Sequence, residues 1–174
     1  MLDEYGKVET GTLRFLDSTH VKVHCDGANP AGGQEKQAMG RTKGGLNTKI
    51  HAVVDNAAAP VAIQLSAGNE ADVTCAPEVI EGLDCGTLVA DKAYDSDGFR
   101  DLLDSIGSNV CIPPRSNRRD LRKYSKHLYK KRHRVENFFQ RLKTYRRVAT
   151  RYDKLAETYF GFVCLSAFIV ETIR

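Results

Sequence analysis

Three segments with a β-strand pattern come before the first segment with a helical pattern, and this order restricts the folds open to the 174-residue chain. Residues 14–25 alternate apolar and polar side chains, which predicts one strand, or two strands joined by a tight turn at Ser18 and Thr19. Residues 48–55 and 60–68 follow as two further strands with a short turn between them, the local pattern of a hairpin. The front of the chain is therefore predicted to be mainly β-structure.

Helix and strand patterns alternate in the rest of the chain, which ends in helices. The predicted elements are a helix at 75–83 after an N-cap at Thr74, a buried strand from Thr87 to Asp91, a helix at about 97–106, a strand at 109–113, a long helix at roughly 125–150 and an apolar helix at about 155–173. Residues 26–47, rich in Gly, Ala, Asn and Lys, are predicted to form a long exposed loop. This order predicts one α/β domain over residues 1–174, with a mixed sheet of about five strands flanked by helices.

Charge is divided unevenly along the chain. Residues 1–112 carry nine Lys or Arg and seventeen Asp or Glu, a net charge of −8, whereas residues 113–174 carry seventeen and five, a net charge of +12. A basic back half fits a polyanionic partner bound by one face, and the acidic front half fits bound cations. The alternative is a solvated helix face on an ordinary charged surface.

Cysteine usage and hydropathy favour a cytoplasmic protein. The five cysteines are scattered, odd in number and not spaced as a metal knuckle, so neither a disulfide framework nor a zinc site is expected. The longest apolar stretch, 159–173, is too short and too interrupted to span a bilayer. This final helix could be either a buried core helix or an interface with another chain.

Three acids could bring hard oxygen ligands to one point: Asp17 on the first strand, Asp91 at the end of a later strand and Glu136 on the long helix. Transfer or hydrolysis of a phosphodiester needs charge stabilisation at the attacking and leaving oxygens, which two divalent ions about 4 Å apart provide. Mg²⁺ prefers carboxylates and retained water as ligands. Acids that converge from different elements are therefore the expected signature of this chemistry.

Each acid also has a structural interpretation. Asp17 could form an Asx-turn, Asp91 could cap a turn or pair with the next lysine, and Glu136 could be one more surface charge. Other acids lie near the same strand ends and compete for the metal role: Asp95, Asp97, Asp55 and Asp26. Asp95 is the strongest rival to Asp91, although its place four residues beyond the apolar strand favours the loop.

The long helix is predicted to carry a polar stripe beside its apolar face. At about 100° per residue, Tyr129, Arg132 and Lys143 all fall within about 40° of Glu136, so the four side chains face one partner. The residues predicted to pack on the sheet lie in an adjoining arc: Leu128, Val135, Phe139 and Leu142. Surface salt bridges such as Arg132 with Glu136 are the alternative. The density of basic residues around Glu136 favours phosphates beside it.

Several segments resemble the transposases of the insertion-sequence-five family, within the larger group of DDE transposases and retroviral integrases. The clearest is a spaced signature of Tyr, two residues, Arg, three residues, Glu, six residues and Lys, which YKKRHRVENFFQRLK supplies with Tyr129, Arg132, Glu136 and Lys143. Two more segments look like family blocks, FLDSTHVKVH around the first acid and LVADKAYDSDGFR around the second. GRTKGGLNTKIHAVVD and RVATRYDKL also resemble the family, so the similarity runs from about residue 15 onward.

The resemblance implies an RNase H-like fold in which Asp17, Asp91 and Glu136 bind two Mg²⁺ ions, with Mn²⁺ as an alternative metal. It implies a DNA transposase, in which water is activated to nick the transposon end and the released 3′-OH then attacks target DNA. Contacts to the end DNA are implied for Arg132 and Lys143, with Tyr129 packing or stacking beside it. Further candidates for phosphate contact, with solvated loop charges as the alternative, are Arg41, Lys43 and Lys49.

The implied partners are double-stranded DNA, as terminal repeats and target, and further copies of the chain in a dimer or larger assembly. Family members usually carry an N-terminal helical DNA-binding region, but only sixteen residues precede Asp17, and no helix-turn-helix fits in them. The chain is therefore expected to be the catalytic domain alone, either the second product of a split reading frame or a truncated remnant. Two other hypotheses are an RNase H-like nuclease without strand transfer and a non-catalytic DNA-binding fragment that regulates a full-length enzyme.

Overall fold

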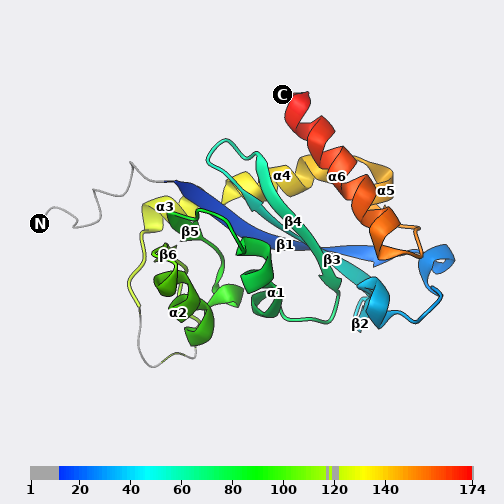
Figure 1. Ribbon diagram of the computed structural model, residues 1–174, viewed down its shortest axis with the longest axis horizontal. Helices are drawn as coiled ribbons and strands as arrows, with labels where there is room; N and C mark the ends of the chain where they lie inside the picture. The colour runs from blue at the N-terminus through cyan, green and yellow to red at the C-terminus, as the bar shows by residue number, and fades with distance from the viewer. Residues whose placement is uncertain (1–11, 117, 119–121, 174) are drawn as a thin grey trace, which may run out of the picture.

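A single mixed sheet forms the centre of the computed structural model, which describes residues 12–116, 118 and 122–173 (Figure 1). Seven strands of this described part span β1 Leu13–Val23, β2 Gly40–Thr42, β3 Gly45–Val54, β4 Pro60–Ala67, β5 Thr87–Val89, β6 Asn109–Cys111 and β7 Thr150–Arg151. β1 pairs antiparallel with β3 and parallel with β5, and β6 lies parallel beyond β5. β4 pairs antiparallel with β3, so the five strands predicted from the sequence lie in the order β4-β3-β1-β5-β6.

The five predicted strands are all present, and two short strands extend them. The segment predicted as one or two strands at 14–25 forms one continuous strand, β1, which ends at Val23, with no turn at Ser18 and Thr19. β2 pairs with the first residues of β3, beyond the end of β4, and β7 pairs with Lys22 and Val23 at the end of β1. The predicted loop at 26–47 is therefore shorter than expected, because β2 and the start of β3 lie within it.

Helices cover both faces of the sheet (Figure 1). Six α-helices of the described part span α1 Asp72–Ile80, α2 Asp97–Ser105, α3 Lys126–Lys130, α4 His133–Leu142, α5 Arg146–Ala149 and α6 Ala156–Thr172. Because side chains alternate along β1, Phe15 packs into a core with Val135 of α4 and Val163 of α6, whereas Leu16 packs into a second core with Val79 of α1. This three-layer α/β arrangement is the predicted fold class, an RNase H-like mixed sheet flanked by helices, and it is confirmed.

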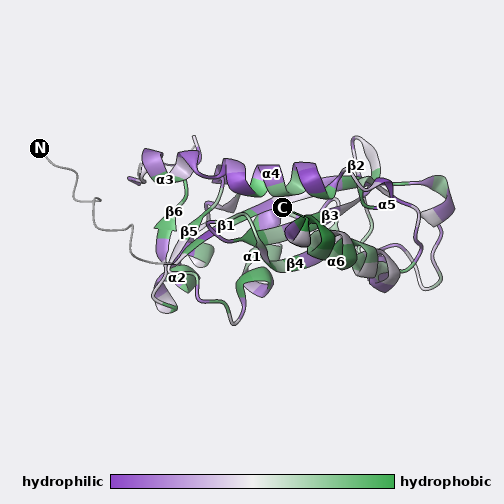
Figure 2. Cartoon of the chain, turned by 90° about the horizontal axis from the view of Figure 1, so that it is seen from above, coloured by the Kyte–Doolittle hydropathy of each residue, from purple (hydrophilic) through white to green (hydrophobic). Residues whose placement is uncertain are grey.

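The predicted long helix at 125–150 is wrong, because the chain forms three helices there. Around Lys131 and Arg132 the backbone hydrogen bonds tighten to three-residue steps, such as Arg132 N–H to the Tyr129 carbonyl at 3.0 Å. The run of basic residues 130–134 places like charges at helical spacing, which disfavours a regular helix. The apolar arc was predicted correctly, since Leu128, Val135, Phe139 and Leu142 all lie in the core. Figure 2 shows hydrophilic residues on the outer side of α3 and α4.

The start of helix α1 differs from its predicted place. Helix α1 begins at Asp72 after Ala71 instead of after Thr74, since an acid in the first turn favours a helix start. The final helix is buried along one side, whereas Leu165 and Phe168 are exposed.

All five cysteines are free, and no helix of the described part is long and apolar enough to cross a membrane. Residues 1–11, on which the prediction about an N-terminal region depends, lie outside the described part.

Helix α2 depends on one side-chain cap at its start. Ser96 Oγ accepts a hydrogen bond from the backbone N–H of Phe99 at 3.2 Å. We expect Ser96→Ala to lower the free energy of unfolding by about 1 kcal/mol, because that backbone donor loses its partner. Urea denaturation measures the loss. Ser105→Ala, at the exposed other end of the same helix, serves as the control and should change stability little; equal losses in both variants would contradict the capping role.

Candidate active site

Asp17 and Asp91 lie at the same level of two neighbouring parallel strands. The last residue pair between β1 and β5 joins Phe15 to Val89, and each acid is two residues further along its own strand direction. Side chains two residues apart on a strand share a face, so Asp17 lies on the side of the sheet that α4 covers, the side on which Phe15 packs. Asp91 follows the end of β5 and is the N-cap of the 3₁₀ turn η4, Lys92–Tyr94.

Arg132 connects the first acid to the helix that carries the third. Its Nη1 donates to Asp17 Oδ2 at 2.6 Å, and its Nη2 donates to Glu136 Oε1. The Arg132 and Asp17 side chains are about one-fifth exposed, whereas Glu136 is nearly half exposed. The ring of Tyr129 lies beside the same guanidinium group, 5.8 Å from its carbon to the ring centroid. The polar stripe predicted from helical spacing is therefore brought against β1, although α3 and α4 are separate helices.

Electrostatics link Asp91 to the same group of side chains. The pKa of Asp17 is raised to about 6, mainly by burial and in smaller part by the nearby charge of Asp91, while Arg132 and a hydrogen bond from the Ser18 N–H oppose the shift. For Arg132, burial acts to lower the pKa, but the charges of Asp17, Glu136 and Asp91 outweigh the effect of burial, so the pKa of Arg132 is above its usual value. Arg132 thus binds Asp17 and Glu136, and the charge of Asp91 acts on both Asp17 and Arg132.

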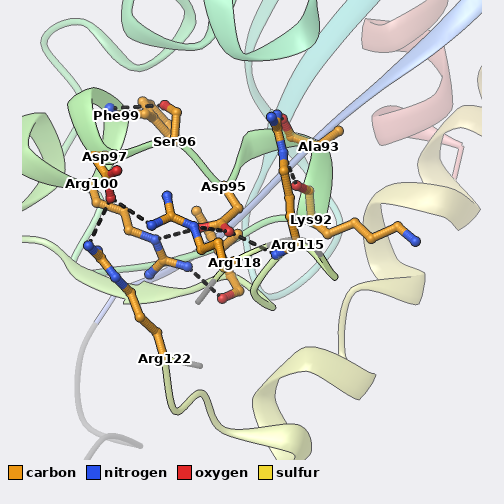
Figure 3. Close-up of polar contacts among 11 residues, drawn as sticks. Lys92, Ala93, Asp95, Ser96, Asp97, Phe99, Arg100, Arg115, Arg118 and Arg122 are labelled. Atoms are coloured by element: carbon orange, nitrogen blue, oxygen red, sulfur yellow. Dashed lines mark hydrogen bonds and ion pairs between the residues drawn. The ribbon is translucent and has the colours of Figure 1, made fainter. Parts of the chain in front are cut away.

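Asp95, the strongest rival to Asp91, is committed to another set of contacts (Figure 3). Its buried carboxylate accepts from Arg100 Nε at 2.8 Å, from Arg118 Nε at 2.6 Å and from the Arg115 backbone N–H at 2.8 Å. Burial alone would raise the pKa of Asp95, but these hydrogen bonds outweigh it and hold the pKa below its ordinary value. Asp97 is exposed and pairs with Arg118 and Arg122.

Lys49 is placed differently from the other proposed phosphate contacts. Its side chain is buried between β3 and α1, where Nζ donates to Asp72 Oδ1 at 2.8 Å and to the Glu70 carbonyl at 2.6 Å. Ser18 also donates to Asp72 Oδ1, at 2.8 Å, on the sheet face opposite Asp17. The sequence pattern suggested a loop lysine, but residue 49 lies inside β3, and its ammonium group has internal partners. Lys49 is therefore not retained as a DNA contact.

The remaining predicted DNA contacts lie at two separate places. Lys143 Nζ donates to Thr19 Oγ1 at 2.6 Å and to the His20 carbonyl at 2.8 Å, so it lies along β1 next to the acids. Burial lowers the pKa of Lys143. Arg41 and Lys43 are exposed at the turn between β2 and β3. Because Arg41 pairs with Leu46 while Asp17 pairs with Ala52, this turn is roughly 20 Å from the acids along the sheet.

Two features of the structure were not expected from the sequence. Among the described residues, the one group of three potential metal ligands within 4.8 Å of one another is His24, Cys25 and Asp26, not the three acids. These residues are consecutive on a turn, so chain connectivity explains their closeness. Arg151 is completely buried and donates to the Gln37 carbonyl and Thr48 Oγ1, at 2.8 and 2.7 Å, which removes it from the surface open to a polyanion.

A mixed sheet with this strand order, covered by helices on both faces, is the fold of the class of RNase H-like proteins. The chain belongs to the DDE transposases: the family described as "Transposase DDE domain" matches residues 9–169. Members of this family are phosphoryl-transfer enzymes that act on DNA and typically use divalent metal ions. The resemblance drawn from the sequence motifs is thereby confirmed.

One curated protein supports the same assignment. The chain is 35% identical over 127 residues to a putative transposase for insertion sequence element IS6501 from Brucella ovis. The aligned region covers 72% of this chain and 98% of that protein. The similarity therefore extends over nearly the full length of that protein.

Proposed function

We propose that this transposase domain cuts the ends of a mobile DNA element and joins the released 3′-OH to target DNA, with Asp17, Asp91 and Glu136 as metal ligands. The observation that carries the proposal is the position of Arg132, whose guanidinium group binds Asp17 and Glu136 with Asp91 in electrostatic reach. One cation thus binds an acid on a strand and an acid on a helix, and the charge of a third acid, at a turn, acts on it. Separate structural roles for the three acids would not require this arrangement.

The chemistry of these side chains fits divalent metal ions. Three carboxylates and one guanidinium group carry formal charges of −3 and +1, so their local charge is −2. The atoms that the three acids offer to a metal ion are all carboxylate oxygens, which are hard ligands. The pKa of Asp17 is raised even with Arg132 beside it, so a further cation would stabilise its charged form. Mg²⁺ or Mn²⁺ bound by these residues would stabilise charge on the attacking and leaving oxygens of a phosphodiester.

The residues around the acids supply DNA contacts in this proposal. With metal ions held by the acids, Arg132 would be released to bind a phosphate of the end DNA, because its planar donors match phosphate oxygens as well as carboxylates. Tyr129 supports the guanidinium group, and Lys143 follows the same edge of β1. The exposed basic residues of α3, with Lys126 and Lys130, extend this surface. Arg41 and Lys43 could contact only a more distant part of the duplex.

The assembly follows from the reaction. Joining two ends of one element to a target requires at least two active sites, so we propose a dimer or a larger assembly on DNA.

The test is an assay of cleavage and joining. The chain, alone and fused to an upstream DNA-binding region, is incubated with Mg²⁺ and a labelled duplex that carries the ends of the element encoding it. We expect nicks at the 3′ end of the element and, with target DNA present, joined products. The dependence of DNA binding on salt is measured in parallel, because phosphate contacts release counterions.

Each result of this assay selects one function. Nicks followed by joined products support the transposase mechanism. Nicks without joined products, at any target concentration, replace strand transfer with a nuclease function. Salt-dependent binding with no nicks from either protein would instead assign the chain to a non-catalytic DNA-binding role.

A further inference from the structure

We infer that Arg115 is a positioning residue for Asp91, an inference that rests on the proposed function. Its side chain donates to the first two carbonyl groups after Asp91: Nε to Lys92 at 3.1 Å and Nη2 to Ala93 at 2.6 Å. Figure 3 shows Arg115 beside both residues of this turn. One planar guanidinium group therefore holds the backbone of η4 from a segment more than twenty residues later in the chain.

The carboxylate of Asp91 is fixed to that same turn. Asp91 Oδ1 accepts from the backbone N–H of Ala93 at 2.7 Å, and the Asp91 carbonyl accepts from the N–H of Tyr94 at 3.2 Å. Strand β5 ends at Val89, two residues before Asp91, so pairing with β1 does not extend to the acid. A shift of η4 would consequently move the Asp91 carboxylate relative to Asp17 on β1.

Arg115 is itself held through Asp95. The backbone N–H of Arg115 donates to Asp95 Oδ2 at 2.8 Å, and the other carboxylate oxygen of Asp95 accepts from Arg100 Nε. Arg100 also donates to the carbonyl of Ile112 at 2.9 Å, next to β6. The segment after β6 is thus attached to the end of η4, and the Arg115 side chain folds back over its start. Asp95, the rival acid in the sequence, supports this attachment instead of binding the metal.

A purely structural role for the Arg115 side chain would have a different consequence. The residue is exposed, so water competes for its two hydrogen bonds and their net contribution to global stability is small. Geometry at a catalytic centre is more sensitive, because a misplacement of about 1 Å can cost roughly a hundredfold in rate. The inference therefore predicts a local effect on the metal site with little change in overall folding.

The experiment compares Arg115→Gln and Arg115→Lys with Arg122→Gln in the full chain. Arg122 is exposed in the same basic segment and contacts Asp97 but not η4, so its variant removes the same charge. Mn²⁺ binding is titrated without DNA by electron paramagnetic resonance. We expect the Kd for Mn²⁺ to rise about tenfold or more in Arg115→Gln, as for other residues that orient metal ligands. Arg115→Lys should recover part of the affinity, because one ammonium group cannot reproduce the forked geometry.

Backbone amide exchange gives a second readout that does not depend on metal. The amides of Ala93, Tyr94 and Asp95 should exchange faster in both Arg115 variants, while those of β1 and β3 keep wild-type rates and show that the variants fold. Wild-type Mn²⁺ affinity in Arg115→Gln, equal weakening in Arg122→Gln, or unchanged exchange in η4 would each overturn the inference. If wild-type protein and Asp91→Asn bind Mn²⁺ equally poorly, the proposed function fails instead, and the exchange rates still decide whether Arg115 holds the turn.

Discussion

Asp91→Asn is expected to reduce cleavage of the element ends by about a thousandfold, equivalent to about 4 kcal/mol of transition-state stabilisation. The substitution replaces a charged oxygen ligand with a neutral amide and leaves Asp17 and Glu136 in place. It should have little effect on folding, because an Asn side-chain oxygen can still accept the hydrogen bond from the Ala93 N–H. Single-turnover cleavage of a labelled end duplex at saturating Mg²⁺ measures the loss.

Matched controls separate loss of the metal ligand from loss of charge. Asp104→Asn removes the same charge from an exposed position on α2 and should cleave at the wild-type rate. DNA binding by Asp91→Asn should be equal to or slightly stronger than that of the wild type, since the variant loses a negative charge near the phosphates. Cleavage by Asp91→Asn within a few fold of the wild type would remove Asp91 from the catalytic set.

The order of elements and the apolar face of the segment at 125–150 could be predicted from local pattern alone. Alternation along residues 14–25 placed Asp17 on a strand, and the apolar run from Thr87 placed Asp91 at a strand end. These predictions succeed because burial imposes a period of two on strands and of about 3.6 on helices. The register of Phe15 with Val89, which brings the two acids level, joins segments more than seventy residues apart and has no local signal.

Predictions about individual charges were less successful, for a related reason. Sequence shows that a residue is charged but not which partner it finds. Lys49 was assigned to an exposed loop, yet it is buried against Asp72, and Asp95 was a potential metal ligand, yet it binds arginines. Arg151 counted toward the basic half of the chain, yet it is completely buried. The pair of Arg132 with Glu136, given from the sequence as the alternative of a surface salt bridge, is present, because the two residues are one helical turn apart and their contact is local.

The partial failure of the long-helix prediction has a consequence for the site. A continuous helix would have set the angle between Tyr129, Arg132 and Lys143 by geometry alone. With the chain tightened at Lys131 and Arg132, contacts to β1 set the positions of these side chains instead. The spaced signature therefore marks residues on the side of α3 and α4 that faces β1. The regular spacing of these residues in the sequence does not require one continuous helix.

The largest loss of stability is expected from Asp95→Ala, which should lower the free energy of unfolding by about 3–5 kcal/mol. The substitution leaves the buried guanidinium group of Arg100 and the backbone N–H of Arg115 without their acceptor. Asp97→Ala, two residues further along the chain but exposed, removes contacts that water can replace and should cost much less. Urea denaturation at pH 7 measures both, and similar losses in the two variants would contradict a buried anchor at Asp95.

The same carboxylate should make part of the stability depend on pH. Its pKa is lower in the folded chain than in the unfolded chain, where it is about 3.9, so its ionised form stabilises the fold above that pH. This contribution is complete at pH 7 and is lost as pH falls from about 4 through the lower folded pKa. The difference in unfolding free energy between wild type and Asp95→Asn should therefore be full at pH 7 and shrink progressively below pH 4. A difference that stays constant down to pH 3 would mean that the Asp95 contacts do not depend on its charge, and the ion pairs with Arg100 and Arg118 would then not be the source of the stability.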